Sequence, residues 1–532
     1  MRHPSPARSQ TAVVSPHGRS RSGPRKWRAV RMISLLAVSA LAIAACGGGT
    51  GSSDAGSFDP TAILKYGVPG NPTSFDPRLS APLDPVFLDV VYESLIKRSP
   101  AGELGPGLAT QWTFSNDNKA LDLTLRQGVV FHDGTPFDSA AVVASLEAFR
   151  KSGAQAAALK PITKVEARGP SAVHIEFSAP SGYMLNILAS EPGMVVSPKA
   201  LNSPDLGTKP VGTGAFQLTS LVQGKVTFTK FDKYWNAAAT SIGGIEMTVF
   251  ADEPTRLRAV VSGQVDGTTI GPGQEKEATT NGLTVVKGPN AQIDGLLLNT
   301  GDPIFSKPLV RQAMMYAFDR KAISDTLFSG NCTPAVQPFP EGLWPNVPEL
   351  NNVDKYHDVA KAKDLLAQAG YPNGFSTELV NGPNTTYTNL AQAFQAQLAE
   401  VGITAKVKTL EFNQMVSDRR TGKFSGAVSL LQVGRPDPSQ FVTDFYLPGG
   451  SYNPGNFNLP GVSDLLAQSR ASGDEKQRQA PMRQIFTNVF DAGPTVIPVC
   501  SVIWVAAFKK GVTGMQVPKF GDYDFASIKI RR

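Results

Sequence analysis

Strand and helix patterns alternate through the second half of the chain, and this alternation limits the choice of fold more than any other feature. Apolar residues at helical spacing predict helices at residues 308–318, 358–369 and 390–401. Strand-like runs lie between and after them, at residues 403–408, 426–431 and 495–499. Gly370 and Gly402 end two of the helices, as glycines often do. Together these patterns predict an α/β fold with a partly parallel sheet.

The first half of the chain is richer in short strands. Strands are predicted at residues 61–68, 121–125, 173–177, 216–218, 225–230, 246–250 and 293–298. Helices are predicted at residues 83–95, 139–149 and 253–262, with Ser139 as an N-cap. The tail returns to strand-like sequence at residues 501–508.

A chain of 532 residues is too long for one compact core, so several domains are expected. The change of pattern predicts two lobes, with chain crossings near residues 290 and 500. Lobe I would comprise residues 59–290 and 501–532, with an inserted subdomain at about 80–205. Lobe II would comprise residues 291–500.

The positive charge of the chain is concentrated at its N-terminus. The first 45 residues hold eight Lys and Arg and no Asp or Glu, and removing those eight charges turns the formal net charge of +7 into −1. The composition of the remaining chain therefore gives no support for a nucleic-acid partner.

The same N-terminus has the form of an export signal. A basic segment precedes the 14-residue apolar run Met32–Ala45, which is too short to span a bilayer as a stable helix. The run Ile43–Cys46 resembles the bacterial lipobox, so residues 1–45 are predicted to be a lipoprotein signal peptide, with Cys46 as the lipidated residue. Residues 46–58 read as a flexible Gly/Ser tether. The alternative is an ordinary cleaved signal with an incidental cysteine.

Two cysteines remain beyond Cys46. In an oxidising compartment, Cys332 and Cys500 either form one disulfide or stay as two separate buried thiols. No metal site is expected, because C-x-x-C and H-E-x-x-H are absent and only three histidines follow residue 45.

Catalytic motifs are also missing. The chain lacks G-x-x-x-x-G-K-[ST] and G-x-S-x-G, so neither a P-loop ATPase nor a serine hydrolase of that type is indicated. His132 and Asp133 are adjacent, and on a strand neighbouring side chains point to opposite faces. We therefore expect no enzyme activity and no cofactor.

Motifs spread over more than 350 residues resemble the extracellular solute-binding proteins of family 5, which include oligopeptide-, dipeptide- and nickel-binding components of bacterial ABC importers. They include Tyr92–Leu95, Pro106–Ala109, Leu125–Pro136, Pro210–Gly214, Tyr234-Trp235, Ser262–Asp266, Val310–Ala313, Ala317–Arg320, Ala360–Leu366, Ala369–Pro372 and Asp437-Pro438. No single motif is decisive, but their order and spacing are specific.

The resemblance implies a two-lobe periplasmic-binding-protein-like fold of type II, with an extra N-terminal subdomain and a ligand cleft between the lobes. In peptide-binding members, the segment before the Asp-Pro motif lies along the ligand. The ligand-binding residues expected here are Arg419, Leu430, Leu431, Gln432, Val433, Gly434, Arg435 and Trp504. Trp344 is a further stacking candidate, although either tryptophan could equally belong to the core.

Two departures from the peptide-binding relatives bear on the ligand. Those relatives usually have Trp where this chain has Leu431, and an Asp that pairs with the ligand ammonium where this chain has Gly434. Arg435 adds a cation beside them, so an anionic, amide-bearing or neutral ligand becomes credible.

The resemblance predicts a monomeric, lipid-anchored receptor on the extracytoplasmic side of the cell membrane. It would capture a peptide or peptide-like solute and deliver it to ABC transporter permease subunits. A ligand-sensing receptor on the same fold is an alternative, and a secreted hydrolase is a weaker one.

Overall fold

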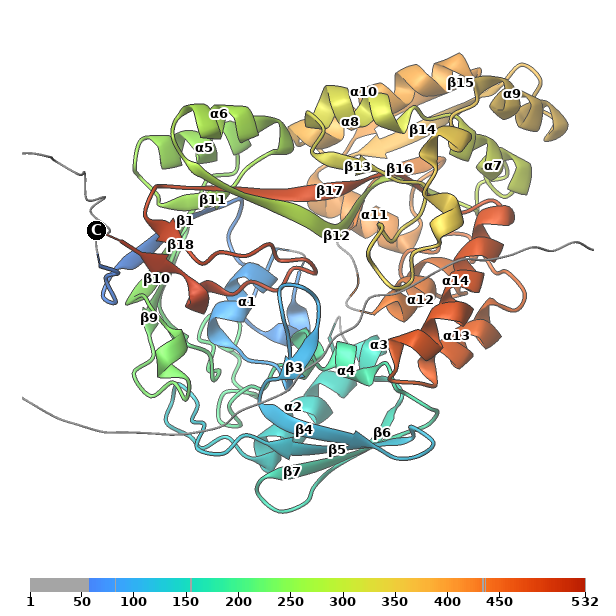
Figure 1. Ribbon diagram of the computed structural model, residues 1–532. Coiled ribbons are helices and arrows are strands. Elements are labelled where there is room, and N and C mark those ends of the chain that lie inside the picture. The colour runs from blue at the N-terminus through green and yellow to red at the C-terminus, as the bar shows by residue number, and fades with distance from the viewer. Residues whose placement is uncertain (1–56, 82, 154–155, 433–434, 436, 532) are drawn as a thin grey trace, which may run out of the picture. The chain divides into compact units, whose positions relative to one another are not determined.

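The computed structural model describes residues 57–531, except 82, 154–155, 433–434 and 436 (Figure 1). Contacts between Cα atoms place the described residues in one compact unit. The predicted signal peptide, Cys46 and most of the predicted tether lie outside the described residues.

A large mixed sheet forms the framework of the described unit (Figure 1). Its strand order is β15-β14-β16-β12-β17-β11-β1-β10-β9-β8, and β13 pairs with β17 off this path. The strands are β1 Ile63–Val68, β8 Phe216–Val222, β9 Lys225–Lys230, β10 Gly244–Val249, β11 Gly267–Thr269, β12 Thr284–Leu298, β13 Cys332–Pro334, β14 Phe375–Asn381, β15 Ile403–Thr409, β16 Ala427–Gln432 and β17 Val496–Phe508. The predicted partly parallel α/β sheet is confirmed, since β1 runs parallel to β10 and β11, and β14 to β15 and β16.

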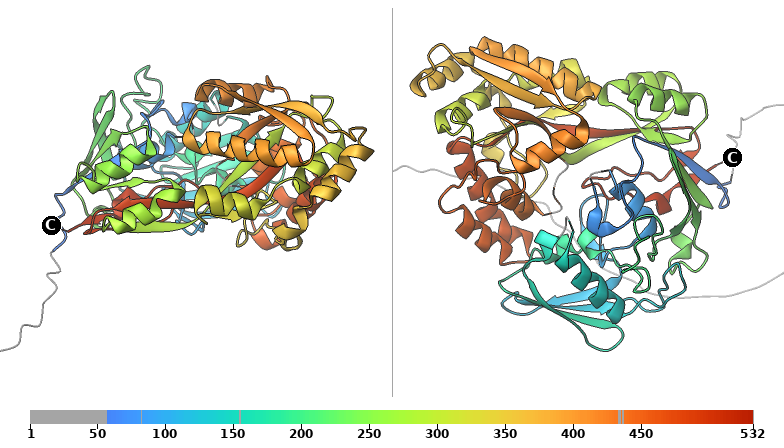
Figure 2. Two further views of the ribbon diagram at one scale, coloured as in Figure 1. Left: turned by 90° about the horizontal axis from the view of Figure 1, so that it is seen from above. Right: turned by 180° about the vertical axis from the view of Figure 1, so that it is seen from behind.

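A smaller antiparallel sheet has the order β4-β5-β7-β6. Its strands are β4 Ala109–Phe114, β5 Ala120–Leu125, β6 Ile162–Ala167 and β7 Ala172–Phe177. Helix α2, Ser139–Lys151, packs against it (Figure 2). Asp138, not the predicted Ser139, is the N-cap, because its carboxylate accepts from the Ala141 amide at 3.0 Å while the Ser139 hydroxyl donates to the Gly169 carbonyl.

The predicted helices form with small changes at their ends. The helices of eight residues or more beyond α2 are α5 Glu253–Val261, α7 Pro308–Tyr316, α8 Arg320–Phe328, α9 Val359–Gln368, α10 Thr385–Glu400, α11 Phe412–Thr421, α12 Pro438–Tyr446, α13 Val462–Arg470 and α14 Glu475–Asp491. The shorter ones are α1 Pro85–Val91, α3 Ala156–Leu159, α4 Met184–Ile187 and α6 Glu275–Thr280. Helix α1 is shorter than predicted because Tyr92 is already extended. Gly370 and Gly402 have φ values of 93° and 89°, as helix-ending glycines do.

Two long strands connect the two main hydrophobic clusters. One cluster draws on residues 64–247 and 504–528, and the other on residues 293–500. Strands β12 and β17 pair antiparallel and contribute to both clusters (Figure 1). The two separate strands predicted at 495–499 and 501–508 are therefore one strand, because β12 pairs with β17 on both sides of Pro498. The exact lobe limits stay a prediction.

Remaining short strands flank this framework. They are β2 Ile96–Arg98, β3 Leu104–Pro106, β18 Val512–Thr513 and β19 Lys529–Ile530. A disulfide joins Cys332 on β13 to Cys500 on β17, with their Cα atoms 5.5 Å apart. Among the residues described, no helix has the length and apolar character needed to cross a membrane.

Candidate functional site

A cavity of about 980 Å³ opens among residues from both hydrophobic clusters. Its lining includes parts of the first cluster's segments, at residues 66–107, 183–194 and 518–526. The lining also includes Trp504 of β17 and, from the second half of the chain, Arg419, Arg420, Arg435, Gln440, Thr443, Asp444, Ser451, Tyr452 and Arg470. A cleft between two such regions is the usual place for a small-molecule site.

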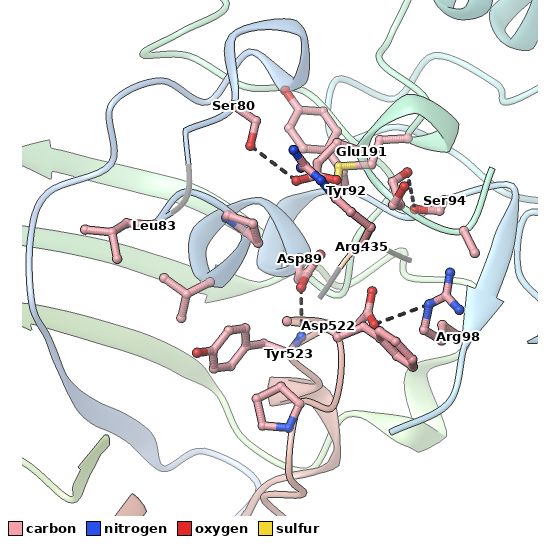
Figure 3. A pocket seen from close by; sticks show the side chains of 18 of the residues that line it. Ser80, Leu83, Asp89, Tyr92, Ser94, Arg98, Glu191, Arg435, Asp522 and Tyr523 are labelled. Carbon is pink, nitrogen blue, oxygen red and sulfur yellow. Dashed lines mark hydrogen bonds and ion pairs between the residues drawn. The ribbon is translucent and has the colours of Figure 1, made fainter. Parts of the chain in front are cut away.

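One part of the lining is acidic, and we call Asp89, Glu191 and Asp522 the acidic wall (Figure 3). The Tyr523 amide donates to Asp89 Oδ2 at 2.8 Å, and the Ser80 hydroxyl donates to Glu191 Oε1 at 3.4 Å. Asp522 faces the guanidinium of Arg98, with 3.5 Å between Oδ2 and Nε.

Burial and nearby negative charges make Asp89 and Asp522 hard to ionise. Burial raises the pKa of Asp522 to about 6, an effect that Arg98 partly offsets and Glu191 reinforces. Burial also raises the pKa of Asp89 well above its usual range, and the charges of Asp522 and Glu191 add to this shift. A cation entering the cavity would favour the ionised carboxylates.

A second part of the lining is cationic, and we call Arg419, Arg420, Arg435 and Arg470 the arginine wall. Arg470 is already engaged, because it donates to the Ser439 carbonyl and the Thr443 hydroxyl and lies 4.9 Å from the Tyr183 ring. Arg420 is exposed.

Arg419 on α11 is the most informative member of the arginine wall. Its exposed fraction is 5%, and its Nε and Nη1 have no hydrogen-bond partner within residues 57–531 as described. The guanidinium carbon lies 5.1 Å from the centre of the Tyr452 ring. A buried guanidinium with unused donors is expensive unless an acceptor arrives, so an anionic ligand group fits this position.

Arg435 enters the cavity from the loop after β16 (Figure 3). Its Nη2 lies 2.6 Å from Asp444 Oδ2, and its guanidinium also lies over Tyr452, at 5.7 Å. Its Nε has no partner among the described residues. Tyr452 thus lies near both Arg419 and Arg435 in the cavity lining, and Asp444 pairs with Arg435.

The other expected ligand residues differ in whether they line the cavity. The Leu430 side chain is buried in the second cluster, so only its backbone could meet a ligand. Leu431 and Gln432 belong to strand β16, whereas Val433 and Gly434 lie outside the described residues. Trp504 lines the cavity and is 9% exposed. Trp344 packs against the second cluster beneath Arg478 and does not line the cavity.

Strand β16 lacks a partner strand along part of one edge, among the residues described. It pairs with β12 from Ala427 to Gln432, but with β14 only at Ala427 and Val428. Beyond Val428, no described strand pairs with the β14 side of β16. An extended ligand could add its backbone there, as peptides do at exposed sheet edges.

The Asp-Pro motif forms a buried joint beside the cavity. Asp437 caps α12, and Arg478 of α14 donates to its Oδ1 at 2.7 Å. Asn186 of α4 donates to the other carboxylate oxygen at 3.0 Å and accepts a hydrogen bond from Arg98. Arg98 therefore links Asp522 on the acidic wall to this joint.

His132 and Asp133 do not form a catalytic pair. His132 Nε2 contacts the Gly214 carbonyl at 3.0 Å, while Asp133 accepts from the Ser197 hydroxyl at 2.7 Å. Among the described residues, Asp294, Cys332 and Cys500 form the one group compact enough to hold a metal ion. Because the two cysteines are joined in a disulfide, they offer no thiolates to a metal.

The acidic wall was missed in the sequence. Its members lie on α1, near α4 and in the C-terminal tail, and no spacing rule connects such distant carboxylates. The available signal was weak: the tail sequence Gly521-Asp522-Tyr523-Asp524 is acidic and turn-like, but nothing local shows what it faces.

Known proteins resemble this chain over most of its length. Residues 103–453 match the family model described as bacterial extracellular solute-binding proteins, family 5 Middle. The glutathione-binding protein GsiB of Salmonella typhi is 30% identical over 454 residues, covering 79% of this chain and 86% of that protein. GsiB of Escherichia coli K12 is 28% identical over 482 residues, covering 85% and 91%.

Solved structures show the same fold. AgaA of A. tumefaciens R10, solved with agropinic acid, is 28% identical with a TM-score of 0.79, covering 88% of this chain and 99% of that one. DppA of Helicobacter pylori, solved with the peptide STSA, is 22% identical with a TM-score of 0.78, covering 89% and 98%. The expected two-lobe periplasmic-binding-protein fold is thereby confirmed.

Proposed function

The chain belongs to the bacterial extracellular solute-binding proteins of family 5, and from this premise we propose that it is the lipid-anchored receptor of an ABC importer. In this role it captures a peptide or peptide-like solute outside the membrane and delivers it to permease subunits. The named relatives are binding proteins, so the family gives no reason to expect catalysis.

The observation that carries the proposal is the buried Arg419 at the cavity wall. Its unused donors require an acceptor, and the free edge of β16 lies in the same half of the chain. A carboxylate and an extended amide backbone are the two features of a peptide that these groups would recognise.

Calorimetry with the full chain tests this role against di- and tripeptides, glutathione, opines and oligosaccharides. We expect micromolar or tighter binding of at least one peptide-like solute, and loss of at least about tenfold in affinity in Arg419→Gln. Binding of oligosaccharides alone would contradict the proposal. Arg168→Gln, on an exposed turn of the small sheet, is the matched control.

The anchor is tested by cell fractionation. Cys46→Ala should leave the membrane fraction, because acyl chains hold such proteins at the surface. A variant that stays membrane-bound would show that Cys46 is not the attachment point. Deletion of the neighbouring permease genes separates importer from sensor, since only an importer loses solute uptake.

Gly434→Asp tests the position of the ligand. An Asp there should strengthen binding of free-amine peptides, as it supplies the counter-charge that peptide-binding relatives carry. An unchanged affinity at neutral pH would place the ligand elsewhere in the cavity.

A further inference from the structure

A buried polar contact joins the segments of the two main hydrophobic clusters, well away from β12 and β17 (Figure 1). Asn186 of α4 lies among residues of the first cluster, and Asp437 at the start of α12 lies among residues of the second. Asn186 Nδ2 donates to Asp437 Oδ2 at 3.0 Å, and both residues are buried. We call the segments around these clusters the first side and the second side.

Each side fixes the polar group that it presents to the other. Arg98 donates from Nη1 to Asn186 Oδ1 at 3.1 Å and from Nη2 to the Asn186 carbonyl at 3.0 Å. Because a guanidinium only donates and a carboxylate only accepts, the amide must turn its oxygen to Arg98 and its nitrogen to Asp437. On the second side, Arg478 and the Ser439 amide hold Asp437 in place. The contact therefore forms between groups that are already oriented.

The charges of this contact are balanced within the second side, not between the sides. The ion pair of Asp437 with Arg478, at 2.7 Å, lies wholly on the second side, and the group that reaches across from the first side is a neutral amide. If the sides separated, Asp437 would keep its cation. The contact can therefore break and form again without leaving a buried charge unpaired.

A backbone contact beside it sets a steric limit. The Gly182 amide donates to the Arg470 carbonyl at 2.9 Å, and Asn118 Nδ2 donates to the Ala471 carbonyl at 2.9 Å. A Cβ atom on Gly182 would lie 2.0 Å from the carbonyl carbon of Ser472, far inside van der Waals contact. Gly182 is not among the glycines with positive φ, so its own backbone tolerates alanine and only the second side excludes it.

These contacts are separate from the solute cavity. The lining of the cavity does not include Asn186, Gly182 or Asp437, and the partners of these groups across the contact are protein atoms. The chain passes from one side to the other along β12 and β17. Two sides connected by such strands can move as rigid bodies about a hinge.

We propose that the contacts of Asn186 with Asp437 and of Gly182 with Arg470 form a latch, which holds the two sides closed over the cavity. This inference rests on the proposed function and adds positioning residues that do not touch the solute. A solute held by both sides binds only the closed arrangement, so its apparent affinity falls in proportion to the closed population. The latch favours the closed arrangement with or without a solute.

Gly182→Ala is the sharpest test, because its only clash is with the second side. Small-angle X-ray scattering of the full chain should give a larger radius of gyration than for the unaltered chain, both without solute and with glutathione. Calorimetry should show glutathione binding weakened by about tenfold or more. Gly105→Ala on β3 is the matched control, since a Cβ there meets nothing within 4 Å and should change neither quantity.

Asn186→Leu tests the hydrogen bond apart from the steric limit. Leucine keeps the size of the side chain and removes the donor to Asp437, which stays paired with Arg478. We expect a smaller increase in the radius of gyration and glutathione binding weakened by about fivefold.

The outcomes separate the latch from the function beneath it. Unchanged dimensions in both variants, without solute and with glutathione, would overturn the latch whatever the affinity is. Larger dimensions with unchanged glutathione affinity would overturn its control of binding. If glutathione binds no form of the chain while Gly182→Ala expands it, the latch stands and the proposed peptide-like specificity is contradicted for this probe.

Discussion

The start of α12 and the middle of β12 each bury a carboxyl group completely, yet the two sites treat that group in opposite ways. Asp437 is 0% exposed and receives hydrogen bonds from Arg478, Asn186 and the Ser439 amide. Asp294 is also 0% exposed, but neither of its oxygens has a hydrogen-bond partner in the described part of the chain. Burial is thus equal, and the partners differ.

The pKa values follow the partners. Burial alone would raise the pKa of Asp437, but the Arg478 guanidinium and the hydrogen bond from the Ser439 amide outweigh it and hold the pKa below the usual range. Burial raises the pKa of Asp294 to about 8, with nearby Gln292 offsetting only a small part without forming a standard hydrogen bond. Asp437 is a buried charge within a joint, whereas Asp294 is a neutral acid beside the disulfide.

The largest expected effect comes from breaking the paired site. Arg478→Leu should lower the free energy of unfolding by about 3–5 kcal/mol at pH 7, because it leaves a buried carboxylate without its cation. Since the pKa of Asp437 is depressed in the folded state, the pair stabilises the protein above about pH 4 and this contribution fades as pH falls. Urea unfolding at pH 7 and pH 3.5 measures the difference.

Lys476→Leu, at an exposed position on the same helix, is the control. A loss below about 1 kcal/mol in Arg478→Leu would show that the Arg478–Asp437 ion pair does not stabilise the fold.

The next largest effect is expected from removing the disulfide, which lies beside the buried carboxyl group of Asp294. Replacing both cysteines, Cys332→Ser with Cys500→Ser, should destabilise the fold by about 2–5 kcal/mol, because a 168-residue separation is no longer closed in the unfolded chain. The new hydroxyls would lie beside Asp294 and could donate to it, which should lower its pKa. Urea unfolding from pH 5 to pH 8 tests both points. If the double variant is as stable as the unaltered chain, the bridge does not stabilise the native protein.

The unpaired site should give a smaller effect with the opposite pH dependence. The folded pKa of Asp294 is raised, so the unfolded chain releases this proton near pH 4 while the folded chain keeps it to about pH 8. The contribution of Asp294 to the free energy of unfolding therefore falls as the pH rises from about 4 to about 8. Asp294→Asn should reduce the loss of stability between pH 6 and pH 7.5 by about 2 kcal/mol.

Comparing two pH values in each variant removes any constant cost of burying the asparagine amide. Thermal or urea unfolding supplies the measurement, and Asp364→Asn on the exposed face of α9 serves as the control. A pH profile identical to that of the unaltered chain would mean that Asp294 ionises normally in the folded state.

The smallest expected effect concerns ligand binding at Asp522, which is intermediate in exposure between buried and open carboxylates. Its pKa of about 6 means that it becomes neutral as the pH falls from 7 to 5. Affinity for a free-amine probe such as glutathione should fall by up to about tenfold over that range, while N-acetylated glutathione should change much less. Calorimetry at three pH values measures both, and equal pH dependence for the two probes would contradict an ammonium contact with Asp522.

Much of the fold was predictable because its causes are local. Helical spacing predicts α9 and most of α10 with their following glycines, and alternating apolar residues predict β5 and β7. Errors arose where neighbours decide the outcome. The end of α1 depends on the extended Tyr92, and the joining of two predicted strands into β17 depends on pairing with β12.

The candidate site was predictable only in part. Arg419, Arg435 and Trp504 were expected from the resemblance and all line the cavity, whereas Trp344 does not. Their use by a ligand remains a prediction, as does that of the segment from Leu430 to Gly434. No local sequence pattern predicts the acidic wall, because its residues belong to segments more than a hundred residues apart.

By itself, the sequence determined the α/β elements and the family resemblance, because each depends on residues close together or on an ordered series of motifs. For the same reason, the sequence alone predicts a lipoprotein signal peptide with Cys46 as the lipidated residue. Only the tertiary structure decided the charge of the two cavity walls and the opposite behaviour of Asp294 and Asp437. The physical reason is that a carboxyl group's ionisation depends on burial and on nearby charges and donors, and these come from whichever distant segments the fold places around it.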